Sequence, residues 1–273
     1  MASGSYADIT TTAIPGKNSD MTATDAPAPA KRLEWQLAEV RGIMAETYRV
    51  KTLLLELARP LGHQPGQHVD VRLTADDGYQ AQRSYSISSA PEDKLLSLTV
   101  ERVTDGEVSP YLVDELRVGD RLQLRGPIGG HFVWTSSTHE PLCLIAGGAG
   151  VTPLMAMLRH RDQAPRPAPA LLIYSARSLA DVIFRDELDA MARRDNCLSV
   201  IYALTREQPV GWQGHRGRID KTLLATSVTP VSRLSAVYVC GPTSFVESVS
   251  GSLVELGFDA LRIKTERFGP SGS

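Results

Sequence analysis

Residues 142–153 read LCLIAGGAGVTP and contain the pattern that decides the fold. LCLIA is entirely apolar, which is the composition of a strand buried on both faces of a sheet. A glycine turn follows, and then Val151, Leu154, Met155 and Leu158 recur at helical spacing. A strand, a tight turn and a helix in this order are typical of a parallel α/β sheet.

The same order of strand and helix continues downstream. Further strands are expected at ALLIYSA (170–176), LSVIYAL (198–204), AVYVCG (236–241) and LRIKT (261–265). Apolar residues at helical spacing predict helices between them that include Phe184 and Phe245. This arrangement predicts a doubly wound parallel sheet.

Upstream, residues 35–135 predict a different architecture. Short alternating β segments, separated by turn residues, occur at LAEVRG (37–42), TLLLEL (52–57), HVDVRL (68–73), RSYSIS (83–88), LLSLTV (95–100) and RLQLRG (121–126). Their spacing predicts a small antiparallel barrel. One helical segment interrupts them, SPYLVDEL, with Ser109 as the expected cap and Pro110 as its first residue.

The predicted fold class is therefore β plus α/β, a small antiparallel β-barrel domain followed by a doubly wound parallel-sheet domain. We expect a disordered tail at residues 1–32, the barrel at 33–137, the α/β domain at 138–265 and a C-terminal tail at 266–273. Met21 is a possible native start, which leaves open whether residues 1–20 are native.

Composition excludes several classes of protein. The chain has 273 residues, with 29 Lys and Arg against 31 Asp and Glu. It therefore has no excess of positive charge that would favour binding to nucleic acid. No run approaches the roughly 18 to 20 apolar residues of a membrane-spanning helix. Cys143, Cys197 and Cys240 are far apart, and no histidines pair at metal-ligand spacing, so no metal site is predicted. A cytoplasmic protein with free thiols is the simplest interpretation.

The chemistry is carried by four short motifs in a fixed order: RSYS (83–86), GEVS (106–109), GGAGVTP (147–153) and CGP (240–242). Strand alternation places Arg83 and Tyr85 on one face of RSYS and both serines on the other. GEVS precedes a helix, whose free N–H groups favour an anion such as a pyrophosphate. GGAGVTP connects a buried strand to a helix, although it is not the GxGxxG dinucleotide fingerprint.

With these motifs in this order, residues 35–268 resemble the ferredoxin–NADP reductase family, in a stand-alone form without an iron–sulfur domain. The resemblance implies that FAD lies between the barrel and the nucleotide domain. It also implies that Tyr85 packs on the isoalloxazine ring, Arg83 pairs with the FAD pyrophosphate, and Ser86 lies near flavin N5. The other FAD-binding residues that it implies are Ser84, Val100, Gly106, Glu107, Val108 and Ser109.

For the pyridine nucleotide, the resemblance implies that the glycine loop allows close approach and that Thr152 lies between the nicotinamide and the flavin. Cys240 is expected beside nicotinamide C4, or else is an ordinary buried strand residue. Glu266 and Phe268, placed after the last strand, match an acidic and an aromatic residue near the flavin, with a frayed polar terminus as the alternative. The other implied nucleotide contacts are Gly148, Gly150, Pro153, Gly241 and Pro242. The expected catalytic residues are Ser86, Thr152, Cys240 and Glu266.

The choice between NADPH and NADH depends on cations at the ends of the second and third strands of the α/β domain. Arg177 follows YSA, and Thr205 and Arg206 begin a TREQ segment that resembles the SREQ of NADPH-using members. Because a guanidinium fork suits a dianionic phosphate, NADPH is favoured. The alternative is that these arginines are solvated or bind the ordinary pyrophosphate.

The resemblance implies an FAD-dependent oxidoreductase that takes a hydride from NAD(P)H to flavin N5 and passes electrons to a separate redox partner, such as a ferredoxin or an oxygenase component. Two alternatives stay open, a free-flavin or small-molecule reductase and a non-catalytic flavin- or nucleotide-binding subunit. No nucleic acid or membrane partner is expected. The acceptor, the oligomeric state and the group that shields the flavin are left open by the sequence.

Overall fold

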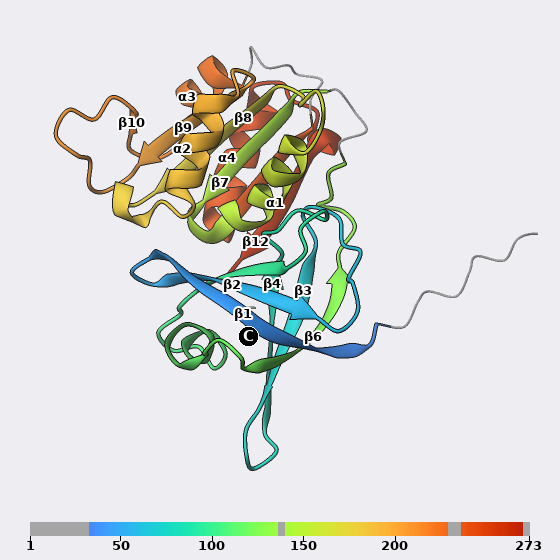
Figure 1. Cartoon of the computed structure of the whole chain (residues 1–273). Helices are drawn as coiled ribbons and strands as arrows, with labels where there is room; N and C mark the ends of the chain where they lie inside the picture. Colours follow the sequence, from blue (N-terminus) through green and yellow to red (C-terminus); the bar gives the residue numbers. More distant parts are fainter. Residues whose placement is uncertain (1–32, 136–139, 229–235, 270–273) are drawn as a thin grey trace, which may run out of the picture. The chain divides into compact units, whose positions relative to one another are not determined.

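The fold consists of two six-stranded sheets, one antiparallel and one parallel (Figure 1). The computed structural model describes residues 33–135, 140–228 and 236–269, and the tail predicted to be disordered lies outside these ranges. The arrangement confirms the predicted fold class. We call the antiparallel sheet the first sheet and the parallel sheet the second sheet.

The first sheet contains all six predicted β segments. Its strands are β1 (Trp35–Thr47), β2 (Val50–Leu57), β3 (His68–Thr74), β4 (Gln80–Ser86), β5 (Leu96–Glu101) and β6 (Arg121–Ile128). They lie in the order β4-β3-β6-β1-β2-β5, and a bridge between Ile87 and Leu98 joins the end of β4 to the opposite edge strand. Alternate side chains such as Val40 and Leu55 are fully buried inside. The sheet therefore curls into the predicted barrel.

The segment predicted as a helix over residues 109–116 is helical over residues 109–115, most of it as a π-helical turn. It forms one π-helical turn, Tyr111–Glu115, which Pro110 precedes. Ser109 does not cap this turn, so that prediction is wrong. Its Oγ instead accepts a hydrogen bond from the Val103 N–H at 3.0 Å and closes the GEVS turn.

The second sheet is parallel and lies between two layers of helices. Its strands are β7 (Leu142–Gly147), β8 (Ala170–Ala176), β9 (Leu198–Leu204), β10 (His215–Arg216), β11 (Val237–Pro242) and β12 (Ile263–Phe268). Its helices are α1 (Val151–Asp162), α2 (Arg185–Arg194), α3 (Lys221–Ser227) and α4 (Thr243–Glu255). Leu144 packs with Leu158 of α1, whereas its neighbour Ile145 packs with Val249 of α4. Within the three described ranges, no helix is both long and apolar enough to cross a membrane.

The order of the second sheet creates a switch point beside β7. The strands lie in the order β10-β9-β8-β7-β11-β12, so the chain leaves β7 toward β8 on one side and later returns to β11 on the other. Doubly wound sheets bind ligands outside the carboxyl ends of their strands at such a point. The glycine turn that follows β7 lies there.

The last strand is longer than predicted. β12 pairs with β11 along its whole length, with Cys240 opposite Glu266 and Pro242 opposite Phe268. The expectations that Glu266 and Phe268 follow the last strand, and that a C-terminal tail begins at residue 266, are therefore wrong. The ladder extends because β11 continues through Pro242 and supplies pairing partners, whereas the residues of KTERF lack the apolar alternation that marks a strand.

Candidate functional site

The glycine loop after β7 packs directly against β11. A Cβ atom on Gly150 would lie 2.1 Å from the carbonyl oxygen of Cys240, so only glycine allows this approach. Gly148 has a positive φ of 55°, which lets the chain turn from the strand into α1. The next residues begin α1, and Thr152 is buried with no hydrogen-bond partner for its Oγ1 in the described chain. The predicted loop therefore forms at the predicted place.

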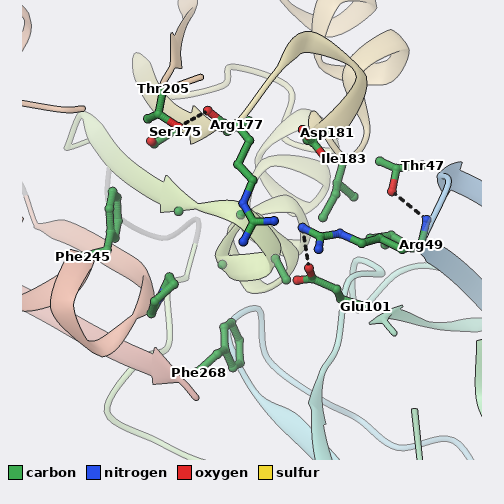
Figure 2. A pocket seen from close by; sticks show the side chains of 17 residues that line it. Thr47, Arg49, Glu101, Ser175, Arg177, Asp181, Ile183, Thr205, Phe245 and Phe268 are labelled. Atoms are coloured by element: carbon green, nitrogen blue, oxygen red, sulfur yellow. Dashed lines mark hydrogen bonds and ion pairs between the residues drawn. The ribbon is translucent and has the colours of Figure 1, made fainter. Parts of the chain in front are cut away.

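A first cavity of about 260 Å³ opens at the carboxyl ends of the parallel strands (Figure 2). The second sheet and its loops line it with Gly147, Gly148, Ala149, Gly150, Ser175, Ala176, Arg177, Asp181, Ile183, Thr205, Pro242, Phe245 and Phe268. The first sheet contributes the opposite wall through Thr47, Arg49, Val50 and Glu101. This is the position at which doubly wound sheets bind their ligands.

The predicted cations at this cavity separate into two groups. Arg177 and Thr205 line it, and no carboxylate pairs with Arg177 among the residues that the structure describes. Arg206 is exposed and is not among the lining residues, although its N–H donates to the Arg177 carbonyl at 2.8 Å. Arg177 is therefore the predicted arginine that faces the cavity directly.

A second cavity of about 760 Å³ lies beside the RSYS strand. It is lined by His68, Gln82, Arg83, Ser84, Ser86, Glu266, Arg267 and Phe268. Phe268 also lines the first cavity, so the two cavities adjoin at this side chain. Tyr85 instead packs against the core of the first sheet, and burial raises the pKa of its hydroxyl. The structure thus brings Arg83, both serines of RSYS and the β12 residues together.

The GEVS and RSYS motifs meet through an ion pair. Glu107 accepts a hydrogen bond from Arg83 at 2.7 Å and another from the Tyr79 hydroxyl at 2.7 Å. These two contacts, that of Tyr79 first, lower the pKa of the Glu107 carboxyl. Sequence reasoning missed Tyr79, and only its position on the turn before β4 could have suggested it.

Two of the predicted flavin contacts have no exposed surface. Val100 and Val108 are completely buried in the core of the first sheet. Their side chains fill this core and line neither cavity. Gly106 is half-buried, and Ser109 is occupied within the GEVS turn. Glu107 is the exposed residue of GEVS, and its carboxylate is engaged by Arg83 and Tyr79.

A partly buried carboxyl group, that of Glu266, lies where the two sheets meet. The Ser86 hydroxyl donates to Oε1 of Glu266 at 3.5 Å, and Oε2 of Glu266 is buried without a partner in the described chain. Burial raises the pKa of Glu266 to about 7, and the Ser86 contact opposes this shift. Across the ladder, burial and then the nearby Glu266 raise the pKa of the Cys240 thiol. Ser86, Cys240 and Glu266, all predicted catalytic residues, are therefore close together.

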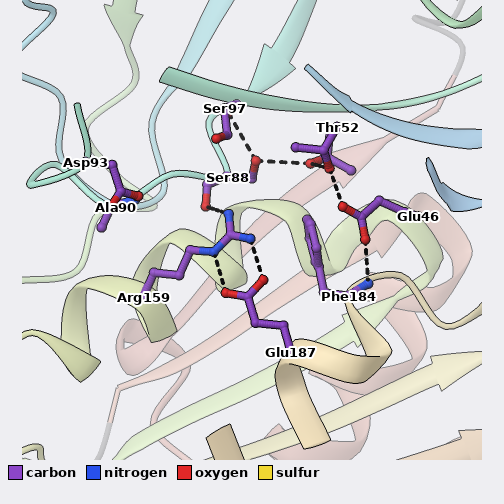
Figure 3. A network of polar contacts seen from close by, with 10 residues as sticks. Glu46, Thr52, Ser88, Ala90, Asp93, Ser97, Arg159, Phe184 and Glu187 are labelled. Atoms are coloured by element: carbon purple, nitrogen blue, oxygen red, sulfur yellow. Dashed lines mark hydrogen bonds and ion pairs between the residues drawn. The ribbon is translucent and has the colours of Figure 1, made fainter. Parts of the chain in front are cut away.

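Polar contacts fix the two sheets relative to each other (Figure 3). Arg159 of α1 donates to the Ser88 carbonyl, just after β4, at 2.8 Å and to both carboxylate oxygens of Glu187 at 2.9 and 2.6 Å. The N–H of Phe184, which has a positive φ of 59°, donates to Glu46 of β1 at 3.3 Å. Charge-assisted contacts of this kind are stronger than neutral ones. They hold the walls of the first cavity in place, and the sequence patterns did not reveal them.

Two family models match the chain. A model described as an oxidoreductase FAD-binding domain matches residues 34–134, and one described as an oxidoreductase NAD-binding domain matches residues 144–251. The first match contains the barrel strands and the second contains the glycine loop and CGP. The FAD-binding match therefore covers the first sheet, and the NAD-binding match covers the second sheet up to α4.

Curated proteins and solved structures are similar to the chain over most of its length. The chain is 32% identical over 234 residues to the glycine betaine monooxygenase reductase subunit of Pseudomonas aeruginosa. This alignment covers 84% of the chain and 63% of that protein. The chain is 30% identical over 282 aligned positions to a flavohemoprotein of Rhizobium meliloti, covering 98% of this chain and 68% of that protein. The flavohem-like FAD/NAD binding domain of nitric oxide dioxygenase from Vibrio cholerae O1 biovar El Tor matches with a TM-score of 0.76 and 28% identity, covering 86% of this chain and 99% of that one. The chain thus spans just under two thirds of the first of these relatives.

The fold and the two family-model matches define a two-domain class of protein, in which an FAD-binding domain of the oxidoreductase type is followed by an NAD-binding domain of the oxidoreductase type. The chain belongs to the ferredoxin–NADP reductase family, as its four motifs predict.

Proposed function

We propose that the chain is an FAD-dependent reductase that takes a hydride from NAD(P)H and passes electrons to a separate redox partner. The single observation that carries this proposal is that two cavities, one beside RSYS and one at the glycine loop, adjoin at Phe268. A flavin in the second cavity and a nicotinamide entering from the first would meet at this junction. Alignment of two reactants in this way is the main contribution a protein makes to hydride transfer.

The residues around the second cavity fit FAD. Arg83 offers a guanidinium to a pyrophosphate, and Glu266 carries a buried carboxylate oxygen without a partner in the described chain. A flavin ring could satisfy such atoms, because its edge carries both hydrogen-bond donors and acceptors. When bound, FAD supplies the hydride acceptor and the release of single electrons.

The chain's own residues would bind FAD and the pyridine nucleotide, orient them, and exclude water from the site. Arg83 and the GEVS turn would hold the pyrophosphate of FAD, and the glycine loop would let the pyridine nucleotide approach. Cys240 and Thr152 are buried and line neither cavity, so they would act by supporting the glycine loop, which packs against the Cys240 carbonyl and leads into α1 at Thr152. Glu266, with Ser86 beside it, would hold or release a proton near neutral pH.

The redox partner proposed is an oxygenase or a ferredoxin. The support is that a relative sharing 32% identity is named as the reductase subunit of a monooxygenase. A cytoplasmic location is proposed as well, because all three cysteines are free. The domain limits proposed are residues 33–137 for the FAD-binding domain and 138–269 for the NAD(P)-binding domain, the second extended to include β12.

Anaerobic titration of the FAD-loaded protein with NADPH, and separately with NADH, tests the function and the nucleotide preference. We expect either nucleotide to bleach the visible flavin absorption, and NADPH to do so at lower concentration. Arg177→Ala should raise the NADPH concentration required by about tenfold or more, because it removes charge-assisted hydrogen bonds. Arg206→Ala should have a smaller effect, since Arg206 lies outside the cavity lining.

The outcomes of this titration separate the alternatives. If NADPH and NADH bleach the flavin at the same concentration, the proposed reductase function stands and the proposed preference for NADPH is rejected. A protein whose bound flavin neither nucleotide reduces would be a binding subunit, and reduction of added free flavin by a protein without bound FAD would identify a free-flavin reductase.

Cys240→Ser is expected to slow flavin reduction several-fold while leaving nucleotide affinity nearly unchanged. The thiol is completely buried in β11 opposite Glu266, so a shorter and more polar group would change packing beside the junction of the cavities. Stopped-flow reduction at saturating and limiting nucleotide measures both quantities. Cys143→Ser, a buried change on β7, is the control. Equal reduction rates for the wild type and Cys240→Ser would reject a role for this thiol.

A further inference from the structure

One arginine of the first sheet faces the first cavity. Arg49 lies in the turn between β1 and β2, and it lines the cavity together with Thr47 and Glu101 (Figure 2). Its main chain is fixed on both sides, because its N–H donates to the Thr47 hydroxyl at 3.4 Å and its carbonyl accepts from the Arg102 N–H at 2.9 Å. The four motifs of the sequence do not include this residue.

The Arg49 guanidinium is held in place by one ion pair and keeps hydrogen-bond donors that this pair does not use. Its Nη2 pairs with Glu101 at 3.0 Å, and the two side chains are 29% and 31% exposed. Within the described chain this ion pair engages only one of the guanidinium nitrogens, so Nε and Nη1 keep donors for a ligand. A partly buried guanidinium with free donors binds phosphate in a fork that lysine cannot reproduce.

The charges in the cavity favour an extended anion. Asp181 accepts hydrogen bonds from the N–H and hydroxyl of Ser178, so this carboxylate has partners of its own. Glu101 is paired with Arg49. Arg177, from the second sheet, lines the same cavity and has no carboxylate partner among the described residues. Two guanidinium groups from two different sheets therefore face one cavity whose floor is the glycine loop.

We propose that Arg49 binds a phosphate group of the pyridine nucleotide and, with Arg177, clamps it between the two sheets. The inference rests on the proposed function, because it takes a pyridine nucleotide as the ligand of the first cavity. Arg177 alone would fix the nucleotide only to the second sheet. Arg49 belongs to the sheet that carries RSYS, so its contact fixes the nucleotide relative to the second cavity, where the flavin is proposed to bind. Glu101 holds the guanidinium in the position that this contact requires.

The test compares Arg49→Ala and Arg49→Lys with Arg102→Ala in the FAD-loaded protein. Arg102 is a matched control, because it follows β5 next to Glu101, pairs with Asp114 at 2.6 Å, and lines neither cavity. ADP-ribose, which contains the phosphates without a nicotinamide, is the probe in a calorimetric titration. We expect Arg49→Ala to weaken ADP-ribose binding by about tenfold, and Arg49→Lys to restore part of the loss.

Flavin reduction gives the second readout. Arg49→Ala should raise the NAD(P)H concentration for half-maximal reduction more than it lowers the rate at saturation, and FAD content should match that of Arg102→Ala. Binding of ADP-ribose by Arg49→Ala as tightly as by the control would overturn the inference. This binding test is independent of the proposed reaction. If the wild type binds ADP-ribose but its flavin is not reduced by NAD(P)H, the proposed reductase function is rejected, and the comparison of Arg49→Ala with Arg102→Ala remains valid.

Discussion

Gly150→Ala is expected to destabilise the folded protein by about 3 kcal/mol or more and to lower the yield of FAD-loaded protein. A Cβ atom at this position would lie 2.1 Å from the Cys240 oxygen, 2.4 Å from the Cys240 carbonyl carbon and 2.7 Å from the Gly241 nitrogen. All three atoms belong to the backbone of β11, which pairs with β7 and β12. They cannot move without disturbing the centre of the second sheet.

Thermal and urea denaturation would measure this loss of stability, and Gly251→Ala is the matched control. Gly251 lies in α4, and a Cβ atom added to it would meet no other atom within 4 Å, so alanine there should stabilise the helix by about 0.5–1 kcal/mol. Opposite signs for the two variants are therefore expected. Unchanged stability of Gly150→Ala would mean that the loop and β11 are farther apart than the structure places them.

Glu266→Gln is expected to remove a pH dependence centred near neutral pH. Burial raises the pKa of this carboxyl from 4.5 to about 7, so the folded protein binds the proton more tightly than the unfolded chain does. The wild type should therefore lose stability as pH rises from about 4.5 to about 7, and remain level above. Glutamine is neutral at every pH, so the variant should be more stable by about 3 kcal/mol at pH 8 and nearly equal at pH 4.5.

The same variant tests the proton role of Glu266 in turnover. With ferricyanide as acceptor, the NAD(P)H-driven rate of the wild type should change around pH 7, and Glu266→Gln should lack this change. Glu115→Gln, at an exposed carboxyl of the π-helical turn, should keep the wild-type profile. A pH profile that is identical in the wild type and Glu266→Gln would exclude this carboxyl as the titrating group.

The sequence alone determined the architecture, because strand alternation, helical spacing and turn residues are local properties. LCLIAGGAGVTP predicted a buried strand, a glycine turn and a helix, and the structure places β7 and α1 there. The order of the four motifs also predicted the family. Short elements were missed, since two residues in β10 and seven in α3 carry too little periodicity to be recognised.

Only the tertiary structure decided which side chains meet. Glu266 reaches Ser86 because β12 adds to the far side of β11, and the register of that ladder sets Glu266 opposite Cys240. Arg49 faces the glycine loop because the two sheets pack at their ends, which no local pattern records. Convergence of this kind depends on strand order, register and packing between residues far apart in the chain, whereas sequence periodicity reports only on neighbours within one element.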